Sequence, residues 1–171
     1  MKVVSNSGPL IALAKLGCLH LLRPLYGQIS IPSAVYTEAV SDGLARGASD
    51  ALSLELALRK QDIKSINLAD ASLPPVSASL ALHRGEKHAI QLAMNKKADL
   101  ILLDDLKARD EAKKLGLSVK GTLGVFVDSL RGDLLSLNEL DLIFKTLLKR
   151  DDIWIAAGLV HRVWELLESE S

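Results

Sequence analysis

Two adjacent carboxylates, Asp104 and Asp105, stand directly after an apolar run from Leu100 to Leu103. Like charges this close repel each other, and the repulsion grows where water is excluded. A divalent cation turns such a pair into a binding site, because Mg²⁺ and Mn²⁺ prefer carboxylate, carbonyl and water oxygens. The pair therefore predicts a hard-cation site at the end of a strand.

Other polar residues occupy comparable positions. Asn6 and Ser7 follow the first β-branched run, Glu86 stands at the start of an amphipathic stretch, and Glu38 lies among Ala and Val. Each has a local alternative: Asp105 as a helix N-cap, Glu86 as an anion favoured by the helix dipole, Asn6 as a turn residue. Glu38 can likewise be a solvated residue on a helix face.

The sequence argues against several other chemistries. The histidines are scattered and follow no zinc-ligand spacing; they are His20, His83, His88 and His161. There is no P-loop and no dinucleotide fingerprint, and nothing around Ser7 suggests a serine-hydrolase triad. The segment "GTLG" at 121–124 is more typical of a turn than of a phosphate cradle.

Short apolar runs alternate with helical patterns along most of the chain. Strands are predicted at 2–6, 28–31, 63–67, 99–103 and 117–121. Helices are predicted at 10–17, 19–27, 33–40, 49–60, 85–98, 106–116, 122–131, 135–150 and 156–169, with loops at 43–48 and 70–79. The run at 99–103 lacks polar alternation, which is typical of a strand buried on both faces. We therefore expect an α/β fold: a Rossmann-like three-layer sandwich with a four- or five-stranded parallel sheet, followed by C-terminal helices. In such sheets, ligands bind beyond the carboxyl ends of the strands.

Composition indicates one globular domain. The chain has 171 residues, 49% of them hydrophobic, and a formal net charge of zero. No apolar run approaches the ~20 residues of a membrane helix, and the first residues lack the apolar segment of a signal peptide. Cys18 is the only cysteine, so it has no intrachain disulfide partner, and we expect a cytoplasmic protein.

The order of these motifs resembles a PIN domain. The resemblance rests on "VVSNSGPLIALAKLG", "IPSAVYTEAV", "GEKHAIQLA" and "ADLILLDDLKARDEAKKLGLSVKGTLG". It is nearest to a PIN-like subgroup with a DDxxAR motif and a GTxG turn. It covers residues 1–135, and residues 136–171 are expected to form a helical extension packed on the same domain or at a dimer interface.

The resemblance implies a divalent-metal-dependent endoribonuclease that hydrolyses phosphodiesters with metal-activated water. The implied catalytic residues are Glu38, Glu86, Asp104 and Asp105, and the implied Mg²⁺ or Mn²⁺ ligands are Asn6, Glu86, Asp104 and Asp105. Ser7, Lys87, Lys107 and Arg109 are the implied nucleic-acid contacts. The implied partners are RNA, a homodimer partner and, if the chain is the toxin of a toxin–antitoxin pair, a small antitoxin; no membrane partner is expected.

Two residues depart from the family pattern. Asn6 stands where the family has its first Asp, so the amide oxygen can still ligate a cation but adds no charge. The usual Thr or Ser before the fourth acid is absent, with Leu103 and Asp104 in that region. These departures leave open a catalytically weak or inactive module that binds RNA or protein.

Overall fold

Five short strands form one parallel sheet. They are β1 (Val3–Ser5), β2 (Ile29–Pro32), β3 (Ile63–Ile66), β4 (Leu100–Leu102) and β5 (Val119–Lys120). Their order is β3-β2-β1-β4-β5, and every neighbouring pair is parallel. The computed structural model describes residues 1–68 and 82–170, so the loop predicted at 70–79 lies outside the described residues. The sheet confirms the predicted fold class.

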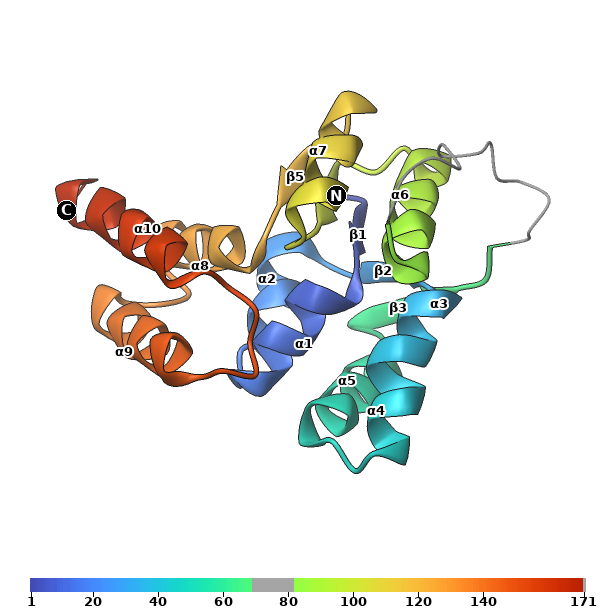
Figure 1. The fold of residues 1–171 in the computed structure, drawn as a ribbon, viewed down its shortest axis with the longest axis horizontal. Helices are drawn as coiled ribbons and strands as arrows, with labels where there is room; N and C mark the ends of the chain where they lie inside the picture. The colour runs from blue at the N-terminus through green and yellow to red at the C-terminus, as the bar shows by residue number, and fades with distance from the viewer. Residues whose placement is uncertain (69–81, 171) are drawn as a thin grey trace.

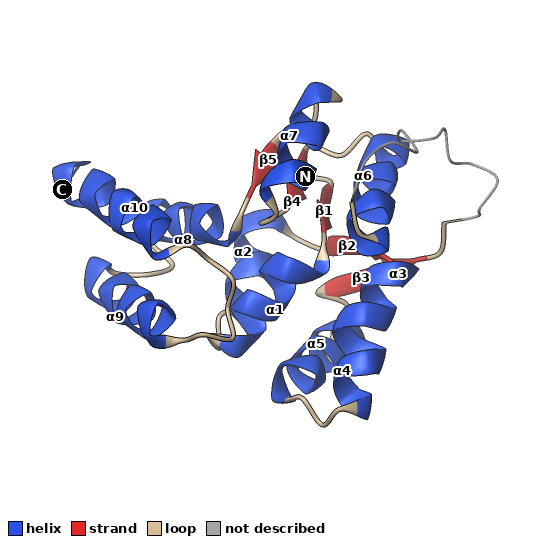
Figure 2. Cartoon of the chain, viewed as in Figure 1, coloured by secondary structure: helices blue, strands red, loops and turns tan. Residues whose placement is uncertain are grey.

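Helices connect and follow the strands (Figures 1 and 2). In chain order they are α1 (Ser7–Lys15), the 3₁₀ turn η1 (Leu19–Leu21), α2 (Leu22–Tyr26), α3 (Ser33–Tyr36), the π-helical turn η2 (Thr37–Ser41), α4 (Asp42–Ala45), α5 (Ser49–Arg59), α6 (Arg84–Lys96), α7 (Leu106–Lys114), α8 (Thr122–Arg131), α9 (Leu137–Lys149) and α10 (Ala157–Glu170). The segments α3, η2 and α4 follow one another without a break.

Both faces of the sheet are buried, which explains the uninterrupted apolar strands. Along β4, Leu100 and Leu102 face one core with residues of α1, α5 and α8. Ile101 and the following Leu103 face a second core with residues of α6 and α7. This alternation follows from the two-residue period of a strand and gives three layers, helix, sheet and helix.

The C-terminal helices extend the first of these cores. Phe144 of α9 makes edge-on contacts with Phe126 of α8 and Trp164 of α10, at centroid separations of 6.1 and 6.0 Å. Val160 and Leu167 of α10 belong to the same buried cluster as the sheet residues. Residues 136–170 therefore pack against the sheet domain through α8.

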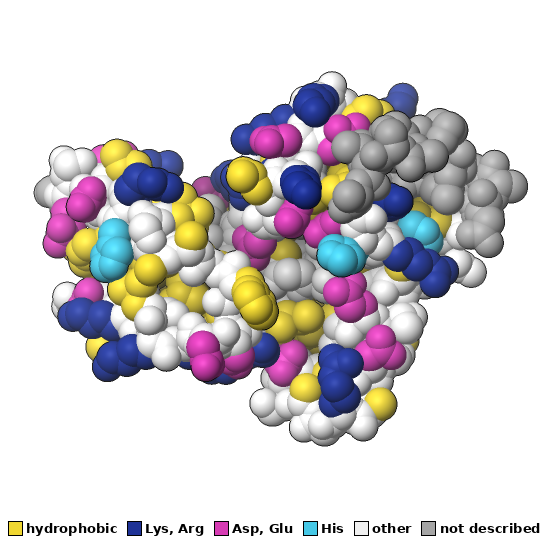
Figure 3. Space-filling model, viewed as in Figure 1, with side chains coloured by type: hydrophobic (Ala, Val, Ile, Leu, Met, Phe, Trp, Pro, Cys, Tyr) yellow, Lys and Arg dark blue, Asp and Glu magenta, His cyan; other side chains and the backbone are white. Residues whose placement is uncertain are grey.

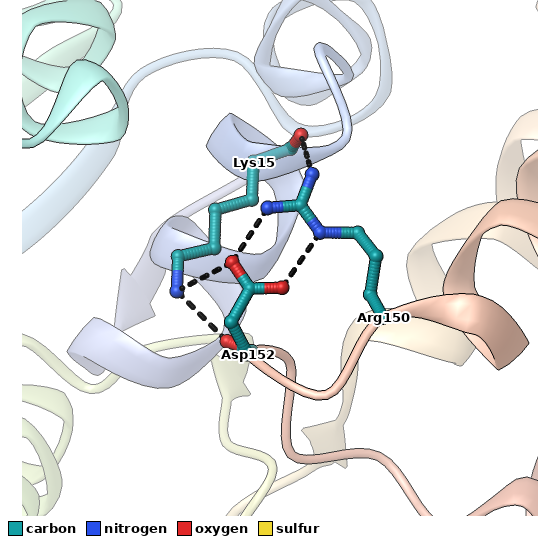
Figure 4. A network of polar contacts seen from close by, with 3 residues as sticks. All are labelled: Lys15, Arg150 and Asp152. Carbon is teal, nitrogen blue, oxygen red and sulfur yellow. Dashed lines mark hydrogen bonds and ion pairs between the residues drawn. The ribbon is translucent and has the colours of Figure 1, made fainter.

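A polar network joins the α9–α10 connection to the end of α1 (Figure 4). Arg150 donates two hydrogen bonds to the Asp152 carboxylate, at 2.7 and 2.6 Å, and one to the Lys15 carbonyl at 3.1 Å. Lys15 Nζ lies 3.3 Å from the same carboxylate. The hydrogen bonds from Arg150 and Lys15 hold the pKa of Asp152 well below its usual range. The network fixes the loop that leads into α10.

Two local predictions differ from the structure. The segment 43–48 was expected to be a loop, yet its first residues belong to α4. Gly43 explains this, because a Cβ there would lie 2.6 Å from the Ala51 Cβ, so glycine lets α4 pack closely on α5. Pro32, expected to stop the second strand, is its last residue and pairs with Ile66.

Within the described residues, no single helix has the length and apolar composition of a membrane span. One pair in the described part of the chain, α1 with the η1–α2 segment, reaches that composition together, and the two are bent by 119° at their junction.

Candidate active site

The predicted polar residues follow the two central strands of the sheet. Asn6 comes directly after β1, and Asp104 and Asp105 come after β4, with Leu103 between. β1 and β4 are neighbours, and the strand order reverses between them. A crevice forms at such a reversal because the adjoining connections leave in opposite directions. The carboxyl ends of β1 and β4 therefore define the candidate site, near the centre of the molecule (Figure 2).

The side chain of Asn6 makes no helix-capping hydrogen bond, and its Oδ1 lies beside Gly85. Asn6 occupies the N-cap of α1, and it is only 6% exposed. Its backbone N–H continues the sheet by donating to the Leu102 carbonyl at 3.1 Å. Ser7 is also buried, and its hydroxyl donates a long 3.4 Å hydrogen bond to Asn6 Oδ1. Ser7 thus supports Asn6 from within the protein.

Gly85 lets Asn6 and Glu38 come together. A Cβ at Gly85 would lie 2.7 Å from Glu38 Oε2 and 3.2 Å from Asn6 Oδ1. A side chain there would displace the Glu38 carboxylate and crowd the Asn6 amide. Gly85 is therefore a site residue that the sequence prediction missed. Its signal was present, since glycine in the first turn of a helix lowers helix stability and needs a structural reason.

Glu38 is carried by the π-helical turn η2. Such turns are rare and are found most often near functional sites, because the inserted residue redirects side chains. Glu38 is exposed, but its Oε2 lies against Gly85 of α6. Its exposure on a helical segment is what the alternative of a solvated residue predicts, and its catalytic role stays a prediction.

Glu86 is buried in the first turn of α6, with 7% of its surface exposed. Its Oε2 accepts a hydrogen bond from the His83 backbone N–H at 2.9 Å, which completes a capping box. Burial raises the pKa of Glu86 against that hydrogen bond, and the nearby charges of Asp105 and Glu38 raise it further.

The two adjacent aspartates have different environments. Asp105 is exposed and is the N-cap of α7, where its Oδ1 accepts from the Ala108 N–H at 2.9 Å. This confirms the predicted capping alternative, while its charge still acts on Glu86. Asp104 is half-buried and accepts two hydrogen bonds from Thr122, from the backbone N–H at 2.7 Å and from Oγ1 at 2.6 Å.

Asp104, Thr122 and Arg109 hold the end of β4 against the start of α8. Arg109 Nη1 donates to the Leu103 carbonyl at 3.1 Å. A Cβ at Gly121 would lie 2.6 Å from Arg109 Nη1 and 2.7 Å from Asp104 Oδ1, so the turn needs glycine. Burial raises the pKa of Asp104, while the Thr122 hydrogen bonds and the Arg109 charge oppose that rise. The DDxxAR segment and the GTxG segment therefore contact each other through polar groups.

The predicted nucleic-acid contacts differ in how exposed their side chains are. Lys107 is exposed at the start of α7, and Lys87 is half-buried in the first turn of α6. Arg109 is engaged with the Leu103 carbonyl, and Ser7 is buried beneath Asn6. Acidic side chains are visible near the middle of the molecule, between α7 and the α3–α4 segment (Figure 3). Lys87 and Lys107 are therefore the predicted contacts that remain accessible to a nucleic acid.

The donor set fits a hard cation. Within residues 1–68 and 82–170, no three acidic, histidine or cysteine side chains already stand at metal-binding spacing. Oxygen donors nevertheless border this end of the sheet: Asn6 Oδ1 and Glu38 Oε2 both lie beside Gly85, Glu86 follows Gly85, and Asp105 follows the neighbouring strand. Oxygen donors of this kind suit Mg²⁺ or Mn²⁺. Glu38 and Asp105 are exposed, so they can turn toward a cation without disturbing the core.

Comparisons with known proteins bear on the family and the fold. The family model DUF3368, described as a PIN domain, matches residues 2–169. Among solved structures, the chain is similar to a PilT N-terminus domain protein from the hyperthermophilic archaeon Sulfolobus solfataricus P2. The two share 20% sequence identity and a TM-score of 0.54 over 76% of this chain and 94% of that one, which shows a shared fold. No curated protein matches the chain.

Proposed function

The chain belongs to the PIN-domain family, and from this we propose that it is a divalent-metal-dependent endoribonuclease. PIN domains are typically nucleases and generally use divalent metal ions. We also infer that it falls in the subgroup marked by the DDxxAR motif, here 104–109. The observation that carries the proposal is the convergence of Asn6, Glu38, Glu86 and Asp105 beyond β1 and β4.

Electrostatics supports a cation at this site. Burial is the main cause of the raised pKa of Glu86, and the charges of Asp105 and Glu38 add to it. A divalent ion beside Glu86 would favour the ionised form of this carboxyl group, because the cation offsets the nearby negative charges. In this proposal Asn6, Glu86 and Asp105 hold Mg²⁺ or Mn²⁺. The ion, when bound, lowers the pKa of coordinated water and stabilises charge on a phosphate.

The remaining residues position the substrate and the ligands. Glu38 is exposed on the far side of Gly85, where its carboxylate can accept a proton from an attacking water. Lys87 and Lys107 can bind the RNA backbone, which gives affinity without sequence choice. Each oxygen of Asp104 accepts one hydrogen bond from Thr122, which fixes the orientation of the carboxylate, and we assign Asp104 to holding the Asp105 backbone in place. In this proposal Asp104 supports the cation ligand Asp105, whereas the sequence suggested that Asp104 binds the cation itself.

A second candidate function is a binding module without strong catalysis. Asn6 favours it, because a neutral amide replaces the carboxylate expected at the end of β1 and lowers the charge available to a cation. Such a module would bind RNA or protein through the same crevice. A cytoplasmic location, a homodimer and a small antitoxin partner belong to the toxin form of the main proposal.

Metal-dependent cleavage of labelled single-stranded RNA tests the main proposal. Wild type should cleave with Mn²⁺ or Mg²⁺ and stop in EDTA, and Asp105→Asn should lose at least about 100-fold in rate. Asp110→Asn is the matched control, because Asp110 is an exposed acid on the same helix and should leave the rate unchanged. Cleavage that persists in EDTA or in Asp105→Asn contradicts the proposal.

The variant Asn6→Asp separates the two candidates. If wild type fails to cleave while Asn6→Asp cleaves with metal, the proposal of a binding module is correct for the natural sequence. If neither cleaves, the metal-dependent nuclease is wrong for this chain. Equal cleavage by both shows that the amide oxygen is sufficient as a ligand.

A further inference from the structure

A cavity of about 350 Å³ adjoins the candidate site on the side of Glu38. It lies between the continuous helix of α3, η2 and α4 and the first turn of α6, which pack against each other (Figure 1). Glu38 and Gly85 line it, so it opens directly from the place where Glu38 and Asn6 meet. A substrate that reaches the carboxylates and extends in this direction must enter the cavity.

The cavity has a cationic wall and an acidic wall. Arg84, at the start of α6, is exposed, and among the described residues no hydrogen bond or ion pair is found for its guanidinium. Asp42, at the start of α4, is exposed on the opposite wall, and its carboxylate is likewise unpaired within the described part of the chain. An unpaired cation and an unpaired anion in one cavity suit a ligand with both a negative group and N–H donors.

Hydroxyl groups add neutral polar contacts between these walls. Thr37 Oγ1 donates to the Ser33 carbonyl at 3.1 Å, which leaves its lone pairs free to accept. Ser33 Oγ makes only a 3.5 Å contact with Asn67 Oδ1, so it can reorient toward a ligand. His83 also lines the cavity, and its imidazole ring can stack on a base. Stacking accepts every base, so the polar contacts must select the ligand.

We propose that this cavity is a nucleotide subsite that holds the RNA nucleotide beside the scissile phosphate, with Arg84 on its phosphate and Asp42 on the N–H donors of its base. The inference rests on the proposed function. A carboxylate accepts two parallel hydrogen bonds from adjacent donors. Guanine has such a pair on its Watson–Crick edge, N1–H and N2–H₂, so the subsite should favour guanine over the other bases. Single-stranded RNA exposes this edge.

Cut-site mapping on a single-stranded RNA pool of random sequence tests the subsite. Asp42→Asn should reduce guanine preference at one position next to the cut by about tenfold, as expected for losing a bidentate contact. Arg84→Gln should raise the KM for RNA by about tenfold and leave base preference unchanged, because phosphate contacts carry no sequence information. Arg46→Gln and Asp110→Asn are controls, exposed residues outside the cavity that should match wild type.

The outcomes separate this inference from the proposed function. If Asp105→Asn abolishes cleavage while Asp42→Asn and Arg84→Gln match wild type in base preference and KM, the subsite is wrong and the nuclease stands. If wild type does not cleave, the probe is a set of fluorescein-labelled RNA tetranucleotides with G, A, C or U at one position. Anisotropy in Mg²⁺ should then show guanine preference that Asp42→Asn removes, and equal binding of all four bases overturns the subsite.

Discussion

Replacing Thr122 by valine should destabilise the protein by about 2 kcal/mol. Thr122 is fully buried, and its Oγ1 donates to Asp104 Oδ2 at 2.6 Å. Valine has nearly the same shape, so the substitution removes the hydroxyl and little else. Hydrogen bonds to charged groups contribute about 1.5–3 kcal/mol, and a half-buried carboxylate oxygen would be left without its partner. The backbone bond from the residue 122 N–H to Asp104 Oδ1 remains in the variant.

Urea unfolding measured by circular dichroism provides the assay. With a typical slope of about 2 kcal/mol per molar urea, a loss of about 2 kcal/mol lowers the midpoint by about 1 M. Thr146→Val is the matched control, because Thr146 is exposed and its hydroxyl bonds to the Leu142 carbonyl of its own helix. Its effect should stay within about 0.5 kcal/mol.

A midpoint for Thr122→Val as close to wild type as that of Thr146→Val would refute the reasoning. Asp104 would then not depend on Thr122, and its carboxylate would be free to act as the cation ligand that the sequence suggested. The measurement therefore decides which of the two adjacent aspartates supports the other. Cleavage activity of Thr122→Val should fall less than that of Asp105→Asn, because every proposed ligand is still present.

Three further outcomes are expected. Asn6→Asp should bind Mn²⁺ at least about tenfold more tightly by calorimetry, since it adds a charge beside the ion; unchanged affinity would place Asn6 outside the cation site. In EDTA, wild type should lose thermal stability as pH rises above 4.5, the usual pKa of a glutamate, through the raised pKa of Glu86, because the folded protein binds that proton more tightly than the unfolded chain. Glu86→Gln should lose less over the same range, and parallel curves would contradict the stated charge environment. Phe144→Ala should cost about 3–5 kcal/mol in urea unfolding, because Phe144 is 3% exposed between Phe126 and Trp164; a loss below about 1 kcal/mol would mean that α9 does not share the core.

Local features of the fold were predictable from the sequence. The apolar run at 99–103 gave a strand buried on both faces, and the helix at 122–131 matches α8 at both ends. The predicted N-cap at Asp105 is confirmed. These features depend on interactions among residues that are close in the chain, so residue type and spacing carry the information. The prediction of a loop at 43–48 was wrong because it missed the close packing of Gly43 on Ala51, a contact between two helices that the local residue pattern does not contain.

The sequence by itself determined the chemical types at the site: an amide and several carboxylates placed where strands end or helices begin. The tertiary structure decided which of them meet. Placing β1 beside β4 brings Asn6 next to the aspartates, and Gly85 brings Asn6 against Glu38. The pairing of β4 with β5 sets Thr122 opposite Asp104, 18 residues away, and so distinguishes two aspartates that are chemically identical in the sequence. Strand order and register arise from the packing of the whole core, which no local pattern of residues records.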